Sequence, residues 1–257
     1  MTLLDAHIHL IDDEYMDYRH HILRTLNELG IKACSVTIDT DSLRKSLRCF
    51  DISTRGTVFL FAGIHPEKAA NEDVQLFYDV FNNNIDCIYG IGEIGLDPVY
   101  ISRDRGISDK QLEIFNRMLG LAEKSRKPVS VHSRGSLHQV LETLKTYNLG
   151  RVLLHWFEGS KKQLATTADM DLFVSYGPSL IYSGEKKALL RKSRRDRILV
   201  ETDGPVRYRG CFNNFPSMST SFLVSVVNCI ASTLEMTYGE TEALLQRNSE
   251  EYLDRKL

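Results

Sequence analysis

The stretch LLDAHIHL, residues 3–10, is an apolar run that carries an aspartate and two histidines. A short apolar run of this kind predicts a buried β-strand. Side chains alternate between the two faces of a strand, so Asp5, His7 and His9 are expected on one face. Buried polar groups are costly unless they are satisfied. The stretch therefore predicts a strand that ends in a polar site, with Asp5 making a hydrogen bond near that site rather than binding an ion.

Seven further short apolar runs follow along the chain. They cover residues 31–38, 57–64, 87–94, 128–133, 151–157, 171–177 and 197–203. Stretches with helical spacing of apolar residues separate these runs, and two more, 217–236 and 240–253, come after the last. Eight strands alternating with helices predict an α/β protein, a (β/α)8 TIM barrel with extra C-terminal helices. An open doubly wound sheet usually has a glycine-rich turn after its first strand, and none follows His9.

Length and composition predict one ordinary globular domain over residues 1–257. Apolar residues make up 42% and charged residues 26% of the chain. The net charge of −2 gives no global attraction to nucleic acid or membrane, so any anion binding must be local. The five cysteines are scattered, without a CxxC pair, and predict free thiols in a reducing cytoplasm. No apolar run approaches the roughly 20 residues of a membrane helix, so no membrane association is expected.

Six residues with metal-binding side chains lie near the C-terminal ends of five predicted strands. They are His7, His9, Glu93, His132, His155 and Asp203. In a TIM barrel these strand ends meet at one rim, where active sites lie. Four histidines and two carboxylates exceed the needs of one tetrahedral zinc, but they suit two divalent ions bridged by a carboxylate. Zinc, manganese, magnesium or a similar ion is expected, although a pure magnesium site would use fewer histidines.

Several motifs occur together in one order. They are DAHIHL (5–10), GIHP (63–66), IGEIGLD (91–97), PVSVHSRG (128–135), LLHWFEGS (153–160), VETDGP (200–205) and QRNSEEYL (246–253). The set resembles the TatD-like metal-dependent hydrolases, the TatD-type deoxyribonuclease family, over nearly the whole chain. The resemblance implies a TIM barrel in which His7, His9, Glu93 and Asp203 hold one ion. It implies that Glu93 bridges to a second ion, held by His132 and His155.

Three loop segments depart from that family's usual pattern. The segment after ETDGP reads Val206-Arg207-Tyr208 instead of an aromatic-leucine pair, and residues 214–216 read Asn-Phe-Pro instead of Asn-Glu-Pro. The segment 98–109 is unusual and contains Arg103 and Arg105. The expected ligand set is intact, whereas loops that would contact substrate differ.

The resemblance implies cleavage of DNA phosphodiester bonds, as an exonuclease-type deoxyribonuclease on single-stranded or frayed ends. Two divalent ions would lower the pKa of a water between them toward about 7. Glu93 and Asp203 are the expected catalytic residues, Glu93 as the bridge and Asp203 as the acceptor of the water proton. DNA ends are the expected partner of a monomeric chain.

Five basic residues that follow strands are expected to bind phosphate. They are His65, Arg103, Arg134, Arg207 and Arg209, and Arg134 matches the arginine of the family's His-x-Arg motif. Trp156 and Phe157 are candidates to stack a base, although at least one is expected to pack between barrel and helices. The basic segment 191–197 precedes the last strand, so we expect it at the opposite end of the barrel as a solvated helix end.

Two other functions stay open at this stage. The same metal centre could hydrolyse an ester or amide, for example a D-aminoacyl-tRNA ester or a small cyclic amide, in a neutral pocket. A non-catalytic TatD-like subunit of a larger assembly is the third hypothesis, and the complete ligand set argues against it.

Overall fold

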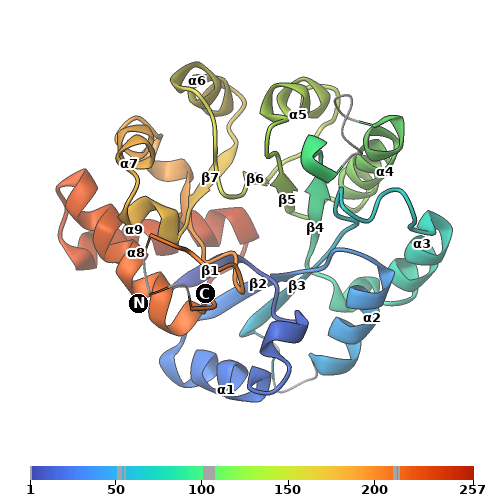
Figure 1. The fold of residues 1–257 in the computed structure, drawn as a ribbon, viewed down its shortest axis with the longest axis horizontal. Coiled ribbons are helices and arrows are strands. Elements are labelled where there is room, and N and C mark those ends of the chain that lie inside the picture. Colours follow the sequence, from blue (N-terminus) through green and yellow to red (C-terminus); the bar gives the residue numbers. More distant parts are fainter. Residues whose placement is uncertain (1, 51–53, 55, 101–107, 211–212, 214) are drawn as a thin grey trace.

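Eight parallel strands follow one another around a barrel in chain order in this computed structural model, which describes residues 2–50, 54, 56–100, 108–210, 213 and 215–257 (Figure 1). The strands are β1 (Leu4–Ile8), β2 (Lys32–Val36), β3 (Val58–Ala62), β4 (Gly90–Gly95), β5 (Val129–His132), β6 (Val152–Leu154), β7 (Phe173–Tyr176) and β8 (Ile198–Val200). Each strand pairs with the next. The predicted TIM barrel is confirmed.

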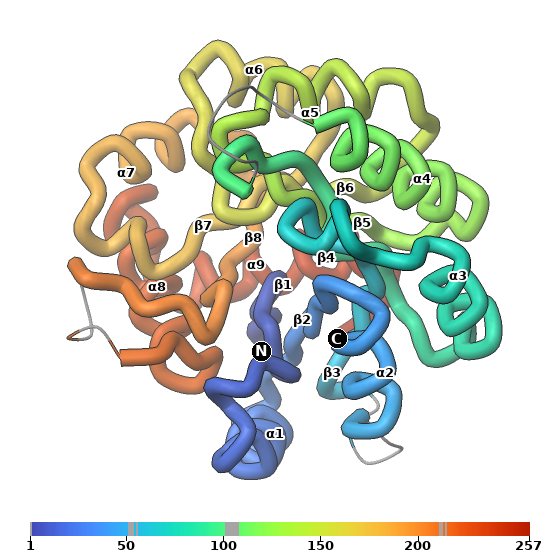
Figure 2. The backbone as a smooth tube through the Cα atoms, turned by 45° about the vertical axis from the view of Figure 1, so that its right-hand side comes forward, coloured from blue at the N-terminus to red at the C-terminus, as the bar shows by residue number. Residues whose placement is uncertain are grey.

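Backbone hydrogen bonds just beyond β8 bring the end of the sheet back to β1. The Asp203 N–H donates to the His7 carbonyl at 2.9 Å, and the His9 N–H donates to the Gly204 carbonyl at 2.8 Å. Figure 2 shows β1 and β8 side by side where the ring of strands meets. Two predicted ligands, His7 and Asp203, therefore become neighbours although they are far apart in the sequence.

Helices form a ring outside the strands (Figure 1). They are α1 (Arg19–Leu29), α2 (Thr40–Cys49), α3 (Val74–Asn83), α4 (Asp109–Ser125), α5 (Leu137–Leu144), α6 (Lys161–Asp169), α7 (Gly184–Leu190), α8 (Ser219–Leu234) and α9 (Tyr238–Leu253). Side chains cap several N-termini; Ser160 and Thr237 form capping boxes at α6 and α9. The extra helices expected at 217–236 and 240–253 are α8 and α9.

The core has two layers. A large cluster packs one side of the strands against the helices, and a smaller cluster fills the barrel. The smaller cluster comprises Leu4, Ala6, Cys34, Val36, Phe59, Phe61, Leu153, Phe173 and Leu199, with Tyr252 and Leu253 of α9. The Tyr252 hydroxyl donates to the carbonyl of Val129, the first residue of β5, at 3.1 Å. The C-terminal helix thus closes the end of the barrel away from the predicted ligands.

The alternation of side chains between the two faces of the sheet is interrupted within β1. Asp5 pairs with Ala33 of β2, but Ile8 pairs with Ser35, so β1 contains one extra residue, as in a β-bulge. Ala6 packs in the barrel interior, whereas the Asp5 carboxylate accepts hydrogen bonds from Thr202 at 2.6 Å and from Ser219 of α8 at 2.7 Å. The prediction that Asp5 and His7 share a face is wrong because it assumed an uninterrupted ladder. The expected hydrogen-bonding role of Asp5 is observed.

The basic segment 191–197, which directly precedes β8, forms ion pairs with acidic side chains. Arg194 and Arg197 each lie 2.8 Å from a carboxylate oxygen of Asp171, and Arg197 lies 2.9 Å from Glu251. Because the segment precedes β8, it lies away from the rim that carries the predicted ligands. Arg194 and Arg197 thus contact protein carboxylates, and Arg197 is buried rather than solvated.

Two observations bear on the chain's environment. Cys34, Cys49, Cys87 and Cys229, the cysteines within the described residues, are all free thiols. Over the same residues, no single helix is long and apolar enough to cross a membrane; α8 and α9 reach that length and hydropathy only as a pair bent by 107°.

Candidate metal centre

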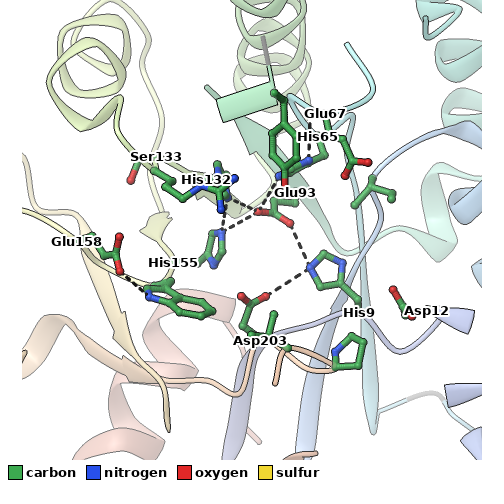
Figure 3. A pocket seen from close by; sticks show the side chains of 16 residues that line it. His9, Asp12, His65, Glu67, Glu93, His132, Ser133, His155, Glu158 and Asp203 are labelled. Carbon is green, nitrogen blue, oxygen red and sulfur yellow. Dashed lines mark hydrogen bonds and ion pairs between the residues drawn. The ribbon is translucent and has the colours of Figure 1, made fainter. Parts of the chain in front are cut away.

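The six predicted ligands come together at the C-terminal rim of the barrel, and Figure 3 shows all of them except His7. His7 belongs to β1, and His9 follows it. Glu93 belongs to β4 and His132 ends β5. His155 and Asp203 stand in the loops directly after β6 and β8. Parallel strands bring these side chains together because all their carboxyl ends point to one rim.

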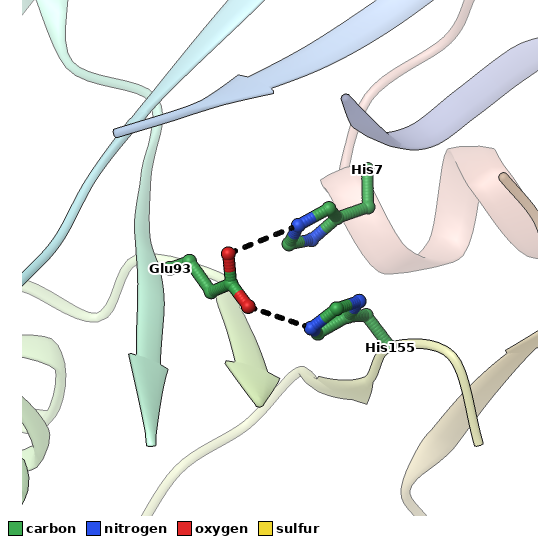
Figure 4. A group of neighbouring side chains, drawn as sticks. All are labelled: His7, Glu93 and His155. Carbon is green, nitrogen blue, oxygen red and sulfur yellow. Dashed lines mark hydrogen bonds and ion pairs between the residues drawn. The ribbon is translucent and has the colours of Figure 1, made fainter. Parts of the chain in front are cut away.

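Glu93 lies at the centre of the cluster, with its two carboxylate oxygens facing different histidines. Oε2 is 3.4 Å from Nε2 of His7 and 3.3 Å from Nε2 of His9. Oε1 is 2.9 Å from Nδ1 of His132 and 2.8 Å from Nε2 of His155. Figure 4 shows the carboxylate between His7 and His155. This is the arrangement that a bridging carboxylate requires.

Asp203 and His65 complete the two sides of the cluster. Oδ1 of Asp203 lies 3.6 Å from Nε2 of His7 and 3.5 Å from Nε2 of His9. Nε2 of His65 lies 3.5 Å from Oε1 of Glu93, on the side of His132. His65, which the sequence places among the phosphate-binding residues, therefore lies within the ligand cluster itself.

An unpartnered nitrogen shows that the cluster fits metal ions. Nε2 of His7 is buried, faces the cluster and has no hydrogen-bond partner. Nδ1 of His7 lies 2.8 Å from Oγ of Ser130, which orients the ring so that Nε2 faces Glu93 and Asp203. An unpartnered buried nitrogen is unfavourable unless something binds it, and imidazole and carboxylate are ordinary ligands of divalent ions.

The protonation states of His7 and Glu93 suit the same purpose. Burial, together with the positive field of His155, lowers the pKa of His7 to about 4, so this ring is neutral at pH 7 and offers a lone pair. Burial opposes ionisation of Glu93, but attraction to the surrounding imidazoles of His65, His155 and His7, together with the contact to His132, outweighs it and holds the pKa of Glu93 well below its usual range. A neutral imidazole and an ionised carboxylate are the forms that bind metals.

His9 and His132 differ from His7 in their protonation. Burial lowers the pKa of His9 and His132, but their carboxylate partners outweigh it and raise these pKa values to about 10 and about 9. A metal ion would therefore displace a proton from each of these two rings.

Asp97 is a functional candidate that the sequence analysis missed. Its Oδ2 accepts a hydrogen bond from Nε2 of His132 at 2.7 Å and lies 2.8 Å from Nη2 of Arg134. Because the Nε2–H of His132 is directed to Asp97, Nδ1 is left to face Glu93. Its position in the sequence could have identified it, because Asp97 ends the IGEIGLD motif two residues after β4, on the rim where the ligands lie.

Glu201 is a second missed candidate. Its carboxylate accepts hydrogen bonds from the Trp156 N–H at 2.7 Å and the Ser175 hydroxyl at 2.6 Å, and lies 3.9 Å from Nδ1 of His155. Burial raises the pKa of Glu201 to about 7. The signal in the sequence is the acidic pair in VETD, in which Glu201 lies two residues before Asp203.

Glycines permit the close backbone approach that the centre needs. Gly95 has φ of +151°, and a Cβ there would lie 2.0 Å from the His132 carbonyl oxygen. At Gly63 a Cβ would lie 2.5 Å from the Glu93 carbonyl oxygen. Any larger residue would push β3, β4 and β5 apart next to the ligands.

A pocket of about 440 Å³ opens over the ligand cluster. Around it lie three carboxylates that do not belong to the cluster, Asp12, Glu67 and Glu158 (Figure 3). Of the described lining residues, Arg134 is the single arginine, and its guanidinium lies 5.2 Å from the ring centre of Tyr100. The mouth of the pocket is therefore more acidic than the sequence analysis expected.

The remaining predicted substrate residues divide into three groups. Arg134 lines the pocket. Arg207 forms an ion pair with Glu14, and neither it nor the exposed Arg209 is among the described lining residues. Arg103 lies outside the residues that the structure describes.

The two aromatic residues next to His155 have different surroundings. Trp156 lines the pocket, whereas Phe157 is buried in the core between barrel and helices. The expectation that at least one of them packs internally is confirmed by Phe157.

A (β/α)8 barrel with histidines and carboxylates gathered at its C-terminal rim defines the metal-dependent hydrolase class of barrels. The TatD related DNase family matches residues 4–254, so the chain belongs to this family and is an enzyme of that class.

Relatives and solved structures agree with this assignment. The putative deoxyribonuclease tatdn3 of Danio rerio is 27% identical over 79% of this chain and 79% of its own length. The uncharacterized metal-dependent hydrolase YabD of Bacillus subtilis is 26% identical over 96% of this chain and 97% of its own. The crystal structure of YjjV, a TatD homologue of Escherichia coli, has a TM-score of 0.87 at 19% identity and covers 98% of both chains, which shows a shared fold.

Proposed function

We propose that this protein is a two-metal hydrolase that cleaves DNA phosphodiester bonds, as an exonuclease-type enzyme on single-stranded or frayed ends. The observation that carries the proposal is the position of Glu93, whose two oxygens each face a separate set of imidazole nitrogens. The name of the Danio rerio relative, a putative deoxyribonuclease, supports DNA as the substrate.

Two groups of residues would hold the ions. His7, His9 and Asp203 lie together on the Oε2 side of Glu93, and His132 and His155 lie on the Oε1 side. His65 adds a further nitrogen on that second side. Bound divalent ions, zinc, manganese, magnesium or similar, supply Lewis-acid activation of water near pH 7 and offset negative charge on phosphoryl oxygens.

Side chains of this chain supply the proton transfer and phosphate contact. Asp203 lines the pocket and has its Oδ1 directed to the histidines of the Oε2 side, so its carboxylate is placed to accept a proton from the attacking water. The same group can return the proton to the leaving oxygen. Arg134, oriented by Asp97, is placed at the mouth to bind a non-bridging phosphate oxygen.

The electrostatics of the mouth favour a substrate end over a continuous polyanion. Asp12 repels phosphates beyond the one being cleaved. Glu67 and Glu158 do so less, because Lys68 and Lys186 lie beside them, and a single lining arginine, among the described residues, attracts phosphates. Few phosphate contacts imply a short binding site and a shallow dependence of affinity on salt. These features support action at chain ends.

The same acidic mouth is the observation that favours the second candidate, hydrolysis of an ester or amide such as a D-aminoacyl-tRNA ester. The free ammonium group of an aminoacyl ester would be attracted by Asp12, Glu67 and Glu158. In this second function the same metal centre would hydrolyse a carboxylic ester or amide bond instead of a phosphodiester bond.

One experiment separates these functions. Protein loaded with manganese, magnesium or zinc is incubated with end-labelled single- and double-stranded DNA, RNA, a phosphodiester dye and an aminoacyl ester. Shortening of labelled DNA from an end is expected, and Glu93→Ala and Asp203→Asn should abolish it. Asp41→Asn, an exposed carboxylate of α2, is the matched control and should retain activity. Ester cleavage without DNA cleavage would replace the first function by the second; activity that survives both site variants would remove the site.

A further inference from the structure

Trp156 has a fixed position in the wall of the pocket, directly after the predicted ligand His155 in the chain. Its backbone has φ of +43°, a left-handed conformation that bulky residues rarely adopt. The N–H of Trp156 donates to the buried carboxylate of Glu201 at 2.7 Å and to the Ser175 hydroxyl at 3.1 Å. Buried hydrogen bonds thus hold the backbone where the indole meets the pocket.

The indole ring itself is held from two further directions. It stacks on the buried ring of Tyr208, with centroids 5.2 Å apart and planes inclined by 24°. Its Nε1–H donates to Glu158 at 3.0 Å. The Lys186 ammonium lies 5.7 Å from the ring centre and 3.6 Å from Glu158. The ring therefore needs little ordering when a ligand binds, which favours affinity.

Charge distribution decides which part of a substrate would occupy this side of the pocket. Glu158 lies beyond His155, opposite Asp12 (Figure 3). Glu158 and Lys186 pair with each other, so this side of the pocket offers no free positive charge to a phosphate, whereas an aromatic ring with little charge can occupy the space beside Trp156. The cleaved phosphate belongs at the ligand cluster, one residue away in the chain.

We propose that Trp156, backed by Tyr208, is the stacking surface for the nucleobase next to the scissile bond, and so selects nucleotides over simple phosphodiesters. This inference rests on the proposed phosphodiester function. Every base has an aromatic face, so stacking of this kind tolerates any sequence. Trp156 thus acts as a specificity-determining residue.

The composition of the chain makes this testable without a substitution. Trp156 is the one tryptophan in the sequence, so intrinsic tryptophan fluorescence reports on this site alone. Metal-loaded protein is titrated with deoxyadenosine monophosphate or with deoxyribose phosphate, which has the same phosphate without a base. Free N-acetyltryptophanamide, titrated in parallel, corrects for light absorbed by the nucleotide. Saturable quenching is expected with the nucleotide and not with the baseless phosphate.

Kinetics give a second readout. Trp156→Ala should raise KM for a DNA substrate about 5- to 150-fold, the range of base–aromatic stacking, with a smaller change in kcat. Trp156→Phe keeps an aromatic face and should recover part of the affinity. Leu29→Ala, which removes an exposed apolar side chain at the C-terminal end of α1, away from the pocket, is the control and should leave KM unchanged.

The outcomes separate this proposal from the function on which it rests. Equal fluorescence changes with both ligands, or none in a protein that hydrolyses DNA, would overturn the stacking role alone. An unchanged KM in a folded Trp156→Ala variant would do the same. Selective quenching in a protein that cleaves no phosphodiester would keep the nucleotide subsite and overturn the hydrolytic function. No quenching and no cleavage would overturn both.

Discussion

Nε2 of His132 lies 2.7 Å from Oδ2 of Asp97, so a buried carboxylate determines which nitrogen of this histidine faces the metal centre. Directing Nε2–H to Asp97 leaves Nδ1 of His132 2.9 Å from Glu93. Carboxylates that orient metal-binding histidines raise ligand basicity and restrict ring rotation. Asp97 also holds Arg134, so it connects the ligand cluster to the mouth of the pocket.

Asp97→Ala should weaken metal binding about 10- to 100-fold, because His132 loses the group that orients it. Metal affinity measured by calorimetry on chelator-treated protein tests this separately from activity. Asp97→Asn keeps an acceptor oxygen and should recover part of the affinity. Wild-type affinity in a folded Asp97→Ala variant would contradict the orienting role.

Removal of metal should lower the thermal stability of the protein. An ion that binds only the folded state at about 100 times its Kd stabilises it by about 2.7 kcal/mol, equivalent to a Tm increase of roughly 5–10 °C for a chain of this size. Thermal unfolding in chelator and in added manganese or zinc measures the difference. Glu93→Ala should reduce the metal-induced shift, and an unchanged shift would place the bound ion elsewhere.

Arg134 and Arg209 should differ in their effect on phosphodiester substrates. Arg134 lines the pocket, whereas Arg209 is exposed and is not among the described lining residues. Loss of a charge-assisted hydrogen bond predicts that Arg134→Ala raises KM about 10- to 150-fold, with little change for Arg209→Ala. Steady-state kinetics on a short DNA substrate compare the two. Equal effects would mean that the loop carrying Arg209 also contacts substrate.

The Asp171–Arg197 pair should make a small, pH-dependent contribution to stability. A hydrogen bond from Arg197 lowers the pKa of Asp171, so the pair stabilises the folded state above the usual pKa of aspartate and loses this as pH falls through the lowered value. Because the Asp171 side chain is 58% exposed, solvent limits the contribution at pH 7 to about 0.2–1 kcal/mol.

Urea unfolding of Asp171→Asn and the wild type measures this contribution. The difference in unfolding free energy between the wild type and Asp171→Asn should be present at neutral pH. It should decrease once the pH falls below about 4, the usual pKa of an aspartate, as Asp171 becomes protonated. A gap that persists in acid would assign the effect to packing rather than charge.

Local sequence patterns were enough to predict the barrel and the histidines and carboxylates that gather at its rim. Short apolar runs and helical spacing reflect burial, which each segment encodes in its own residues. Parallel strands then bring residues at their carboxyl ends to one rim, so Glu93 and His155 could be assigned to one centre without coordinates.

Tertiary structure decided what depends on register and on distant contacts. A register shift with β2, invisible in LLDAHIHL, separates Asp5 from the face of His7. Folding also brings His65 to Glu93 and Asp97 to His132. It pairs Arg207 with Glu14, so that Arg207 does not line the pocket. Strand ends follow from periodicity along the chain, whereas bulges and loop contacts arise from packing between segments that the linear sequence keeps apart.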